Sequence, residues 1–348
     1  MSWADDDGRA SLTDRSGAGG GVRRFAAEEM VACEACSRSN PPTRMHCLYC
    51  GAALPAAGRG AEHLRPTLRR LEEWEGGHNV ILGAAPARPL APEAAAECAA
   101  FLKLETEQLS ALLAFGAALP LARAASTEEA RLIAGRLAAH GLRTFVLGDA
   151  ELRTDEPPRR ARSFGLTGDA LTVHFGAGGE HAGWAWADVS LLVAGRLVSR
   201  RVEVEERQSR FGSRGEVVDA RELAADEAVL DIYPRAGGTG LRVLASGFDY
   251  SCLGAGKGLV AGENFAALVR ALRERAPHAE FDEGYARARH LLSIAWPPSE
   301  RNESGGLRRD RPGRFNTEAV TVVSNEAQFT RYSRLRHYLA QRGRTRAT

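Results

Sequence analysis

The chain has 348 residues, of which 44% are hydrophobic and 26% charged, proportions typical of globular proteins. Collagen-like, coiled-coil and wholly disordered classes are therefore excluded, and the length allows two or three domains. Lys and Arg total 46 against 44 Asp and Glu, so the net charge of +2 gives the chain as a whole no strong attraction to nucleic acid or to a membrane.

The N-terminal residues 1–30 are poor in large apolar side chains and rich in Gly, Asp and Arg, which predicts a disordered tail. Their arrangement is that of neither a signal peptide nor a transit peptide. No apolar run approaches the roughly 18 residues that cross a bilayer. We therefore expect a cytoplasmic protein without membrane insertion.

Four of the cysteines follow the pattern CxxC, ten residues, CxxC. Each CxxC pair forms a tight turn that presents two thiolates to one ion, and the intervening segment lets the second pair complete a tetrahedron. Four sulfur ligands leave no open coordination position. We predict a zinc ribbon at residues 31–54 with one structural Zn²⁺ per chain, held by Cys33, Cys36, Cys47 and Cys50. Two redox-active CxxC pairs are the alternative.

The residues around these cysteines form a family pattern. Asn40 lies between the two pairs, and Gly51 after the second pair permits the positive φ that brings backbone amides toward the sulfurs. In this arrangement the segment resembles the RanBP2-type zinc finger. That family has Trp two positions before the first cysteine, where this chain has Val31, so the ubiquitin or single-stranded RNA binding of the family is not carried over.

Residues 55–77 are predicted to be a linker containing one short helix, Leu68–Trp74. Residues 78–150 then alternate apolar strands and amphipathic helices in the order β-α-α-β-α-β, which predicts a compact α+β domain. Ser126 and Glu129 form a predicted capping box at the start of its last helix. The predicted elements are a strand at 79–83, a helix from Pro92, a helix at 107–115, a strand at 118–122, a helix from Ser126 and a strand at 143–147.

This domain also resembles a known family. A strand with Leu119-Pro120-Leu121 precedes a helix that begins Ser-Thr-Glu-Glu-Ala and ends Leu-Ala-Ala-His-Gly-Leu. On these features, residues 78–148 resemble the C-terminal domain of bacterial ribosomal protein L7/L12. The first helix of that family is lysine-rich and docks translational GTPases. Here that helix has no lysine before Lys103, so the resemblance implies the fold and not the docking activity.

Residues 160–298 contain seven short β-like runs and then an amphipathic helix, Glu263–Arg275, which predicts a seven-stranded β barrel-like domain with C-terminal helices. The stretch Trp184–Val189 resembles the "Trp, any, Asp, apolar" strand of bacterial pleckstrin-homology-like domains. A further helix is predicted near 282–295. The predicted strands lie at 163–166, 170–175, 183–186, 189–193, 198–205, 229–233 and 241–248.

The C-terminal part is predicted to be a polar linker at 299–314 followed by a basic strand and helix at 315–348. From residue 301 onward there are eleven Arg against four acidic residues, a net charge of +7. Arg331, Tyr332 and Arg334 are among the residues that could contact nucleic acid or an acidic partner. A solvated terminal helix is the alternative interpretation.

Other candidate sites are weaker. The loop Gly254–Gly258 lacks the Ser or Thr after Lys257 that a phosphate-binding loop needs. His174, His181 and Asp188 lie near one another in sequence, and Asp249 precedes Cys252. A third metal ligand or a base is missing in each case, so Cys252 is predicted as a buried strand cysteine and Cys98 as a core residue on an apolar helix face.

The predicted fold class is therefore α+β multidomain, with a zinc ribbon, a β-α-α-β-α-β domain and a seven-stranded barrel-like domain. The predicted function is that of a non-enzymatic zinc-binding interaction or adaptor module with a protein partner. One alternative is a nucleic-acid or ribosome-associated protein that uses the zinc ribbon and the Arg-rich tail. A second alternative is an enzyme with a site in residues 160–275.

Overall fold

A computed structural model describes the chain as two compact units, Met1–Arg65 and Pro66–Thr348. Residues 1–24, which hold most of the predicted disordered tail, lie outside the described part. The described residues are 25–55, 64–72, 74–83, 86, 89–176, 179–207, 216–311 and 314–345.

The first unit is small and has little hydrophobic core. Strands β1 (Val31–Ala32) and β2 (Ser39–Asn40) pair in antiparallel fashion after the 3-10 turn η1 (Ala27–Glu29). Its buried apolar cluster consists of Cys33, Cys47 and Leu54, with a few partly buried neighbours. A core of this size cannot offset the conformational entropy of the segment, so the fold needs a further stabilising interaction.

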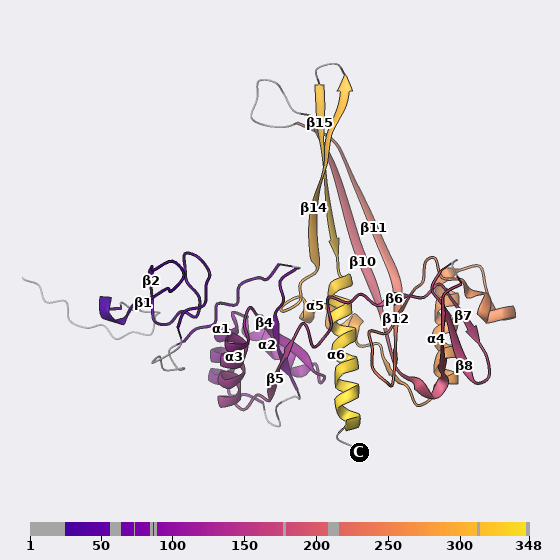
Figure 1. Ribbon diagram of the computed structural model, residues 1–348, viewed down its shortest axis with the longest axis horizontal. Helices are drawn as coiled ribbons and strands as arrows, with labels where there is room; N and C mark the ends of the chain where they lie inside the picture. Colours follow the sequence, from indigo (N-terminus) through magenta and orange to yellow (C-terminus); the bar gives the residue numbers. More distant parts are fainter. Residues whose placement is uncertain are drawn as a thin grey trace, which may run out of the picture. The chain divides into compact units, whose positions relative to one another are not determined.

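The second unit begins with a mixed α/β body in which the predicted order of elements is confirmed. Its three-stranded sheet has the order β4-β3-β5, and both pairings are antiparallel. Figure 1 shows helices α1 to α3 beside this sheet. The elements are β3 (His78–Leu82), α1 (Pro92–Leu102), α2 (Thr106–Ala114), β4 (Leu119–Ala124), α3 (Thr127–Ala139) and β5 (Thr144–Gly148).

Of the two hydrogen bonds of the capping box predicted for α3, the one to the Ser126 side chain is confirmed. The Ser126 side chain accepts a hydrogen bond from the Glu129 backbone amide at 3.2 Å, as an N-cap residue should. The buried Glu129 carboxylate instead accepts the amides of Thr67 and Leu68, at 2.5 and 2.9 Å. Because the carboxylate is buried away from water, these two amides take the place of solvent, and Glu129 attaches the preceding segment to the α/β body.

The helix predicted at Leu68–Trp74 is wrong. In the described residues from Pro66 to Gly77 the chain forms neither helix nor strand and turns at Trp74 and Glu75, and we call this segment the strap. Besides Glu129, Lys103 holds the strap by donating to the Thr67 carbonyl at 2.5 Å. Hydrogen bonds from the strap to Glu129 and Lys103 thus take the place of the helical hydrogen bonds that the local sequence predicts.

The remaining strands form two sheets and not one seven-stranded barrel. A three-stranded sheet has the order β7-β8-β9, and a mixed seven-stranded sheet has the order β14-β15-β10-β11-β12-β6, with β13 pairing to β10. The strands are β6 (Arg159–Arg160), β7 (Ser163–Leu166), β8 (Ala170–His174), β9 (His181–Ala185), β10 (Val189–Arg207), β11 (Glu216–Pro234), β12 (Leu241–Leu244), β13 (Glu280–Asp282), β14 (Ser299–Arg311) and β15 (Arg314–Ser324).

Two predicted strands, 189–193 and 198–205, are one continuous strand, β10, of 19 residues. Gly195, between the two predicted strands, lies inside β10 and forms no turn. A Cβ atom there would lie 2.5 Å from the Phe329 ring, so the close approach of this ring requires glycine. Strand β11 is equally long, so each of the two strands extends about 60 Å. Figure 1 shows β10 and β11 running beside β14 and β15 in one long, narrow sheet.

The prediction of a polar linker at 299–314 is also wrong, because strand β14 occupies most of it and pairs with β15 in antiparallel fashion, with two register shifts. The interpretation of the last helix as solvated fails as well. The helices of this region are α4 (Ala261–Arg275), α5 (Tyr285–Leu292) and α6 (Glu326–Thr345), and the 3-10 segments are η3 (Trp186–Asp188) and η4 (Tyr250–Gly256). Helix α6 buries Phe329, Tyr332 and Leu335 in the hydrophobic core that also contains Val80 of β3.

A second core lies between the β7-β8-β9 sheet, the first part of β10 and helix α4. It contains Phe164, Leu171, Leu192, Ile232 and Leu268, which are all buried. The chain is thus a mixed α+β protein in which the α/β body and α6 share one core, while the strands around α4 enclose another.

Candidate metal centre

The two CxxC segments form matching tight turns. The Ser37 amide donates to the Cys33 carbonyl at 2.7 Å, and the Gly51 amide donates to the Cys47 carbonyl at 3.1 Å. Each turn ends in a residue with positive φ, 74° at Gly51 as predicted and 57° at Ser37, which the sequence did not indicate. The left-handed residue turns the chain back so that backbone amides approach the sulfurs.

The four cysteine sulfurs converge on one point. All four Sγ atoms lie within 4.8 Å of one another. Two separations, 3.6 Å for both Cys33–Cys50 and Cys36–Cys47, join one turn to the other. A Zn–S bond of about 2.3 Å implies a tetrahedron with edges of about 3.8 Å, so this set fits a zinc ion. Two independent redox pairs would not require the sulfurs of different CxxC segments to converge.

Asn40 connects the two turns from a fully buried position. Its amide Nδ2 donates to the Arg38 carbonyl at 2.8 Å and to the Cys47 sulfur at 3.5 Å. Its Oδ1 accepts the Leu48 amide at 2.8 Å. The sequence places Asn40 between the two pairs, and the structure adds its hydrogen bond to the sulfur of a predicted ligand.

The surroundings of the sulfurs differ in how they affect protonation. Burial opposes the charged form of Cys47, but the backbone amides of Cys50 and Tyr49 and the Asn40 side chain donate to its sulfur, and together they lower the pKa of Cys47 to about 6. The Arg38 amide favours the Cys36 thiolate. Burial and the neighbouring thiols outweigh it and raise the pKa of Cys36 to about 12. A metal that binds here displaces the proton of Cys36.

The second turn presents apolar side chains to solvent. Leu48 and Tyr49 are 54% and 57% exposed, although they lie between two metal-ligating positions. The Arg38 guanidinium lies over the Tyr49 ring, 4.6 Å from its centroid. We call Arg38, Leu48 and Tyr49 the knuckle surface. An aromatic ring held under a guanidinium is a common element of binding surfaces.

The structure separates the other candidate residues. His174 and His181 are paired across β8 and β9, with ring centroids 6.1 Å apart. Asp249 caps η4, where the Ser251 hydroxyl and amide donate to it and lower its pKa. Cys252 lies in η4 and not in a strand, and burial raises its pKa. Within the described residues only the four ribbon cysteines form a group that could hold a metal ion.

Cys98 is confirmed as a core residue of α1, and burial raises the pKa of its thiol. The loop Gly254–Gly258 spans the end of η4 and the residues just after it. In this loop the Asn264 side chain accepts the Gly258 amide at 2.7 Å and donates to the Gly258 carbonyl at 2.9 Å. The Asn264 side chain of α4 thus occupies the Gly258 amide, a donor of the kind that a bound phosphate would use.

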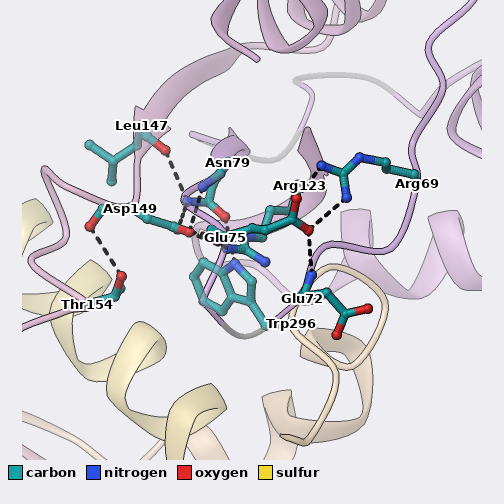
Figure 2. A network of polar contacts seen from close by, with 10 residues as sticks. Arg69, Glu72, Glu75, Asn79, Arg123, Leu147, Asp149, Thr154 and Trp296 are labelled. Carbon is teal, nitrogen blue, oxygen red and sulfur yellow. Dashed lines mark hydrogen bonds and ion pairs between the residues drawn. The ribbon is translucent and has the colours of Figure 1, made fainter. Parts of the chain in front are cut away.

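A buried polar network in the second unit was not predicted. Figure 2 shows Arg123 and Asp149 at its centre, where the guanidinium and the carboxylate lie 2.5 Å apart. Asp149 also accepts the Asn79 amide at 2.9 Å, and Asn79 in turn accepts the Trp296 indole N–H at 2.7 Å. The network attaches the α/β body to the residues before β14, and no local motif could have revealed it.

Several residues of the Arg-rich tail have structural partners. Arg334 is buried, donates to the Glu156 carbonyl at 2.9 Å, and has its pKa lowered by burial. Arg336 pairs with Asp282 at 2.7 Å, and Tyr332 donates to the same carboxylate. The positive charge of α6 is therefore partly used inside the second unit and is less available for an acidic partner.

The helices of the described residues include none that is long and apolar enough to cross a membrane. Comparison of the chain with protein-family models, with curated proteins and with solved structures finds no match.

Proposed function

We propose that the chain is a non-enzymatic zinc-binding multidomain protein that acts as an interaction or adaptor module. The observation that carries this proposal is the convergence of four cysteine sulfurs within 4.8 Å. Zn²⁺ is the metal that four thiolates in tetrahedral arrangement favour, and a site filled by four protein ligands offers no position to a substrate. The ion would therefore hold the first unit folded.

The knuckle surface supports a binding role for this unit. Leu48 and Tyr49 expose apolar area on a turn whose backbone the metal would fix. A rigid aromatic side chain loses little entropy when it is buried against a partner. We propose a protein partner because Leu48, beside Tyr49, adds aliphatic area that a protein surface can cover.

A nucleic-acid or ribosome-associated role is the second candidate, and one observation favours it. Arg38 lies over the Tyr49 ring at 4.6 Å. A guanidinium beside an exposed ring could contact a phosphate while the ring stacks on a base. The six elements from β3 to β5 follow the order of the ribosomal L7/L12 domain, and this resemblance of fold also supports the second candidate.

The region around residues 160–275 is a separate case. Its two sheets share a core with α4, which supports a pleckstrin-homology-like origin of this region.

Photocrosslinking at the knuckle surface tests these candidates. Tyr49 is replaced by the photoreactive residue p-benzoylphenylalanine in the full zinc-loaded chain. The matched control carries the same replacement at Leu259, which is fully exposed in the second unit. The proposal predicts crosslinks from position 49 to a protein of the native host. Crosslinks to RNA would instead support the second candidate. Crosslinks no different from those of the control position would contradict both.

A further inference from the structure

A groove in the second unit runs along one end of strand β14. Its volume is about 770 Å³. One wall is formed by the first part of β14, residues 299–303. The strap at Arg70–Glu72 and Trp74 also lines the groove, as do Arg123, Ala295–Pro298, and Ala327 and Arg331 of α6. The wall formed by five consecutive strand residues distinguishes this groove from a pocket for a small molecule.

The strand in this wall is the last one of its sheet. Strand β14 begins the order β14-β15-β10, and within the described residues it pairs only with β15. An edge strand presents backbone N–H and C=O groups outward at every second residue, and these groups remain available to another strand. Glu300, Arg301 and Glu303 are exposed here, and charges on an edge disfavour unspecific pairing with apolar strands.

The strap contributes Trp74, which is 82% exposed, to the lining of the groove. An exposed Trp gains little from the fold, and aromatic residues of this kind are enriched where partners bind. Side-chain hydrogen bonds hold the turn that carries it. The Arg69 guanidinium forms two hydrogen bonds with the Glu75 carboxylate, at 2.5 and 2.7 Å, and the same carboxylate accepts the Glu72 amide at 2.8 Å.

Further contacts fix this turn against the α/β body, as Figure 2 shows. Arg123 donates to the Glu75 carbonyl at 2.6 Å while it pairs with Asp149. At Gly77 a Cβ atom would lie 2.6 Å from the Arg123 side chain, so the strap approaches the α/β body closely at this glycine. The backbone turn that carries Trp74 is thus anchored before any partner arrives, which lowers the entropy cost of binding.

We propose that this groove binds an extended peptide segment of a partner protein, which adds to the edge of β14 as a further strand and packs an apolar side chain against Trp74. Only another strand matches unpaired backbone groups that repeat along an edge, since a helix satisfies its own. The inference rests on the proposed role as an interaction module. It concerns a different unit from the knuckle surface, so the two surfaces can succeed or fail separately.

The test uses a phage-displayed library of random peptides, selected on the full zinc-loaded chain, with the selected peptides then synthesised. We expect Trp74→Ala to weaken their binding about tenfold or more in fluorescence polarisation. Leu259→Ala, the matched exposed control, should leave binding unchanged, as should Tyr49→Ala on the knuckle surface. Hydrogen exchange should slow at residues 299–303 when the peptide binds and remain unchanged at 219–223, on the outer part of β11.

Several results would overturn the inference. Selection of no peptide, equal binding by Trp74→Ala, or slower exchange at 219–223 in place of 299–303 would each do so. Peptides lost with Tyr49→Ala would belong to the knuckle surface and not to the groove. If the chain self-associates through β14 in a Trp74-dependent manner and binds no peptide, the occupant is a second copy and the proposed peptide is wrong. Absence of crosslinks at Tyr49 would contradict the proposed function without affecting the Trp74 result.

Discussion

Replacing Asn40 with Ala tests whether a buried amide, besides the four thiols, holds the metal centre together. The substitution leaves all four sulfurs in place. It removes the acceptor of the Leu48 amide and the donor to the Arg38 carbonyl, both bonds of 2.8 Å. It also removes the amide that contacts the Cys47 sulfur at 3.5 Å. The backbone pairing of residue 40 with Val31 needs no side chain and should persist.

The size of the effect follows from the two backbone groups left without partners. Each buried unsatisfied group costs about 1–3 kcal/mol, and access of water to the small first unit favours the lower end. The total is about 2–3 kcal/mol. Because folding and metal binding are one equilibrium in a unit with almost no core, this loss lowers the apparent zinc affinity about 30- to 150-fold.

The assay is a competition titration with a chromogenic zinc chelator, performed on the full chain. Ser39→Ala is the matched control, since Ser39 is the exposed neighbour on the same strand. We expect Ser39→Ala to bind zinc as the unmodified chain does. If Asn40→Ala binds zinc within about threefold of this control, the argument that Asn40 supports the centre is wrong.

Three further predictions concern the second unit, each measured as a difference in unfolding free energy or midpoint temperature. Asp231→Asn breaks the ion pair with Arg242. The side chains of Asp231 and Arg242 are only 1% and 4% exposed, so the substitution should cost about 3–5 kcal/mol of unfolding free energy. Asp226→Asn breaks an exposed pair with Arg196 and should cost less than about 1 kcal/mol. Equal costs would contradict the burial argument. Trp296→Phe keeps the ring but loses the bond to Asn79, and should cost about 1–3 kcal/mol against about 0.5 kcal/mol or less for Trp74→Phe. An equal loss in the exposed variant would contradict a role for this bond. The hydrogen bonds from Arg69 lower the pKa of Glu75 to about 2, so the stabilisation that Glu75 contributes is complete above its unfolded pKa of about 4.3 and disappears as the pH falls toward 2. The difference in midpoint temperature between the unmodified chain and Glu75→Gln should therefore shrink over that range, and a difference independent of pH would refute this account.

Features set by neighbouring residues could be predicted from the sequence. The CxxC spacing identified the four cysteines that converge, and Ser126 marked the start of α3. Apolar periodicity indicated all six elements between His78 and Gly148, because each buries one face in a local core.

Features set by distant contacts could not. Strand β14 has exposed polar residues on both faces where it begins, so no alternation marks it as a strand. Asn79 and Trp296 lie 217 positions apart, and their bond depends on the complete fold. Gly195 resembled a turn residue, whereas its role is to admit the Phe329 ring of α6. Likewise Glu129 fitted a capping box locally, but its carboxylate holds the strap.

Elemental analysis of the purified full chain tests the central claim most directly. The account predicts one zinc ion per chain, its loss in Cys47→Ser, and its retention in Cys98→Ser, whose thiol lies in the core of the second unit. A chain that contains no metal while residues 31–54 remain folded, or a Cys47→Ser variant that retains the zinc, would contradict it.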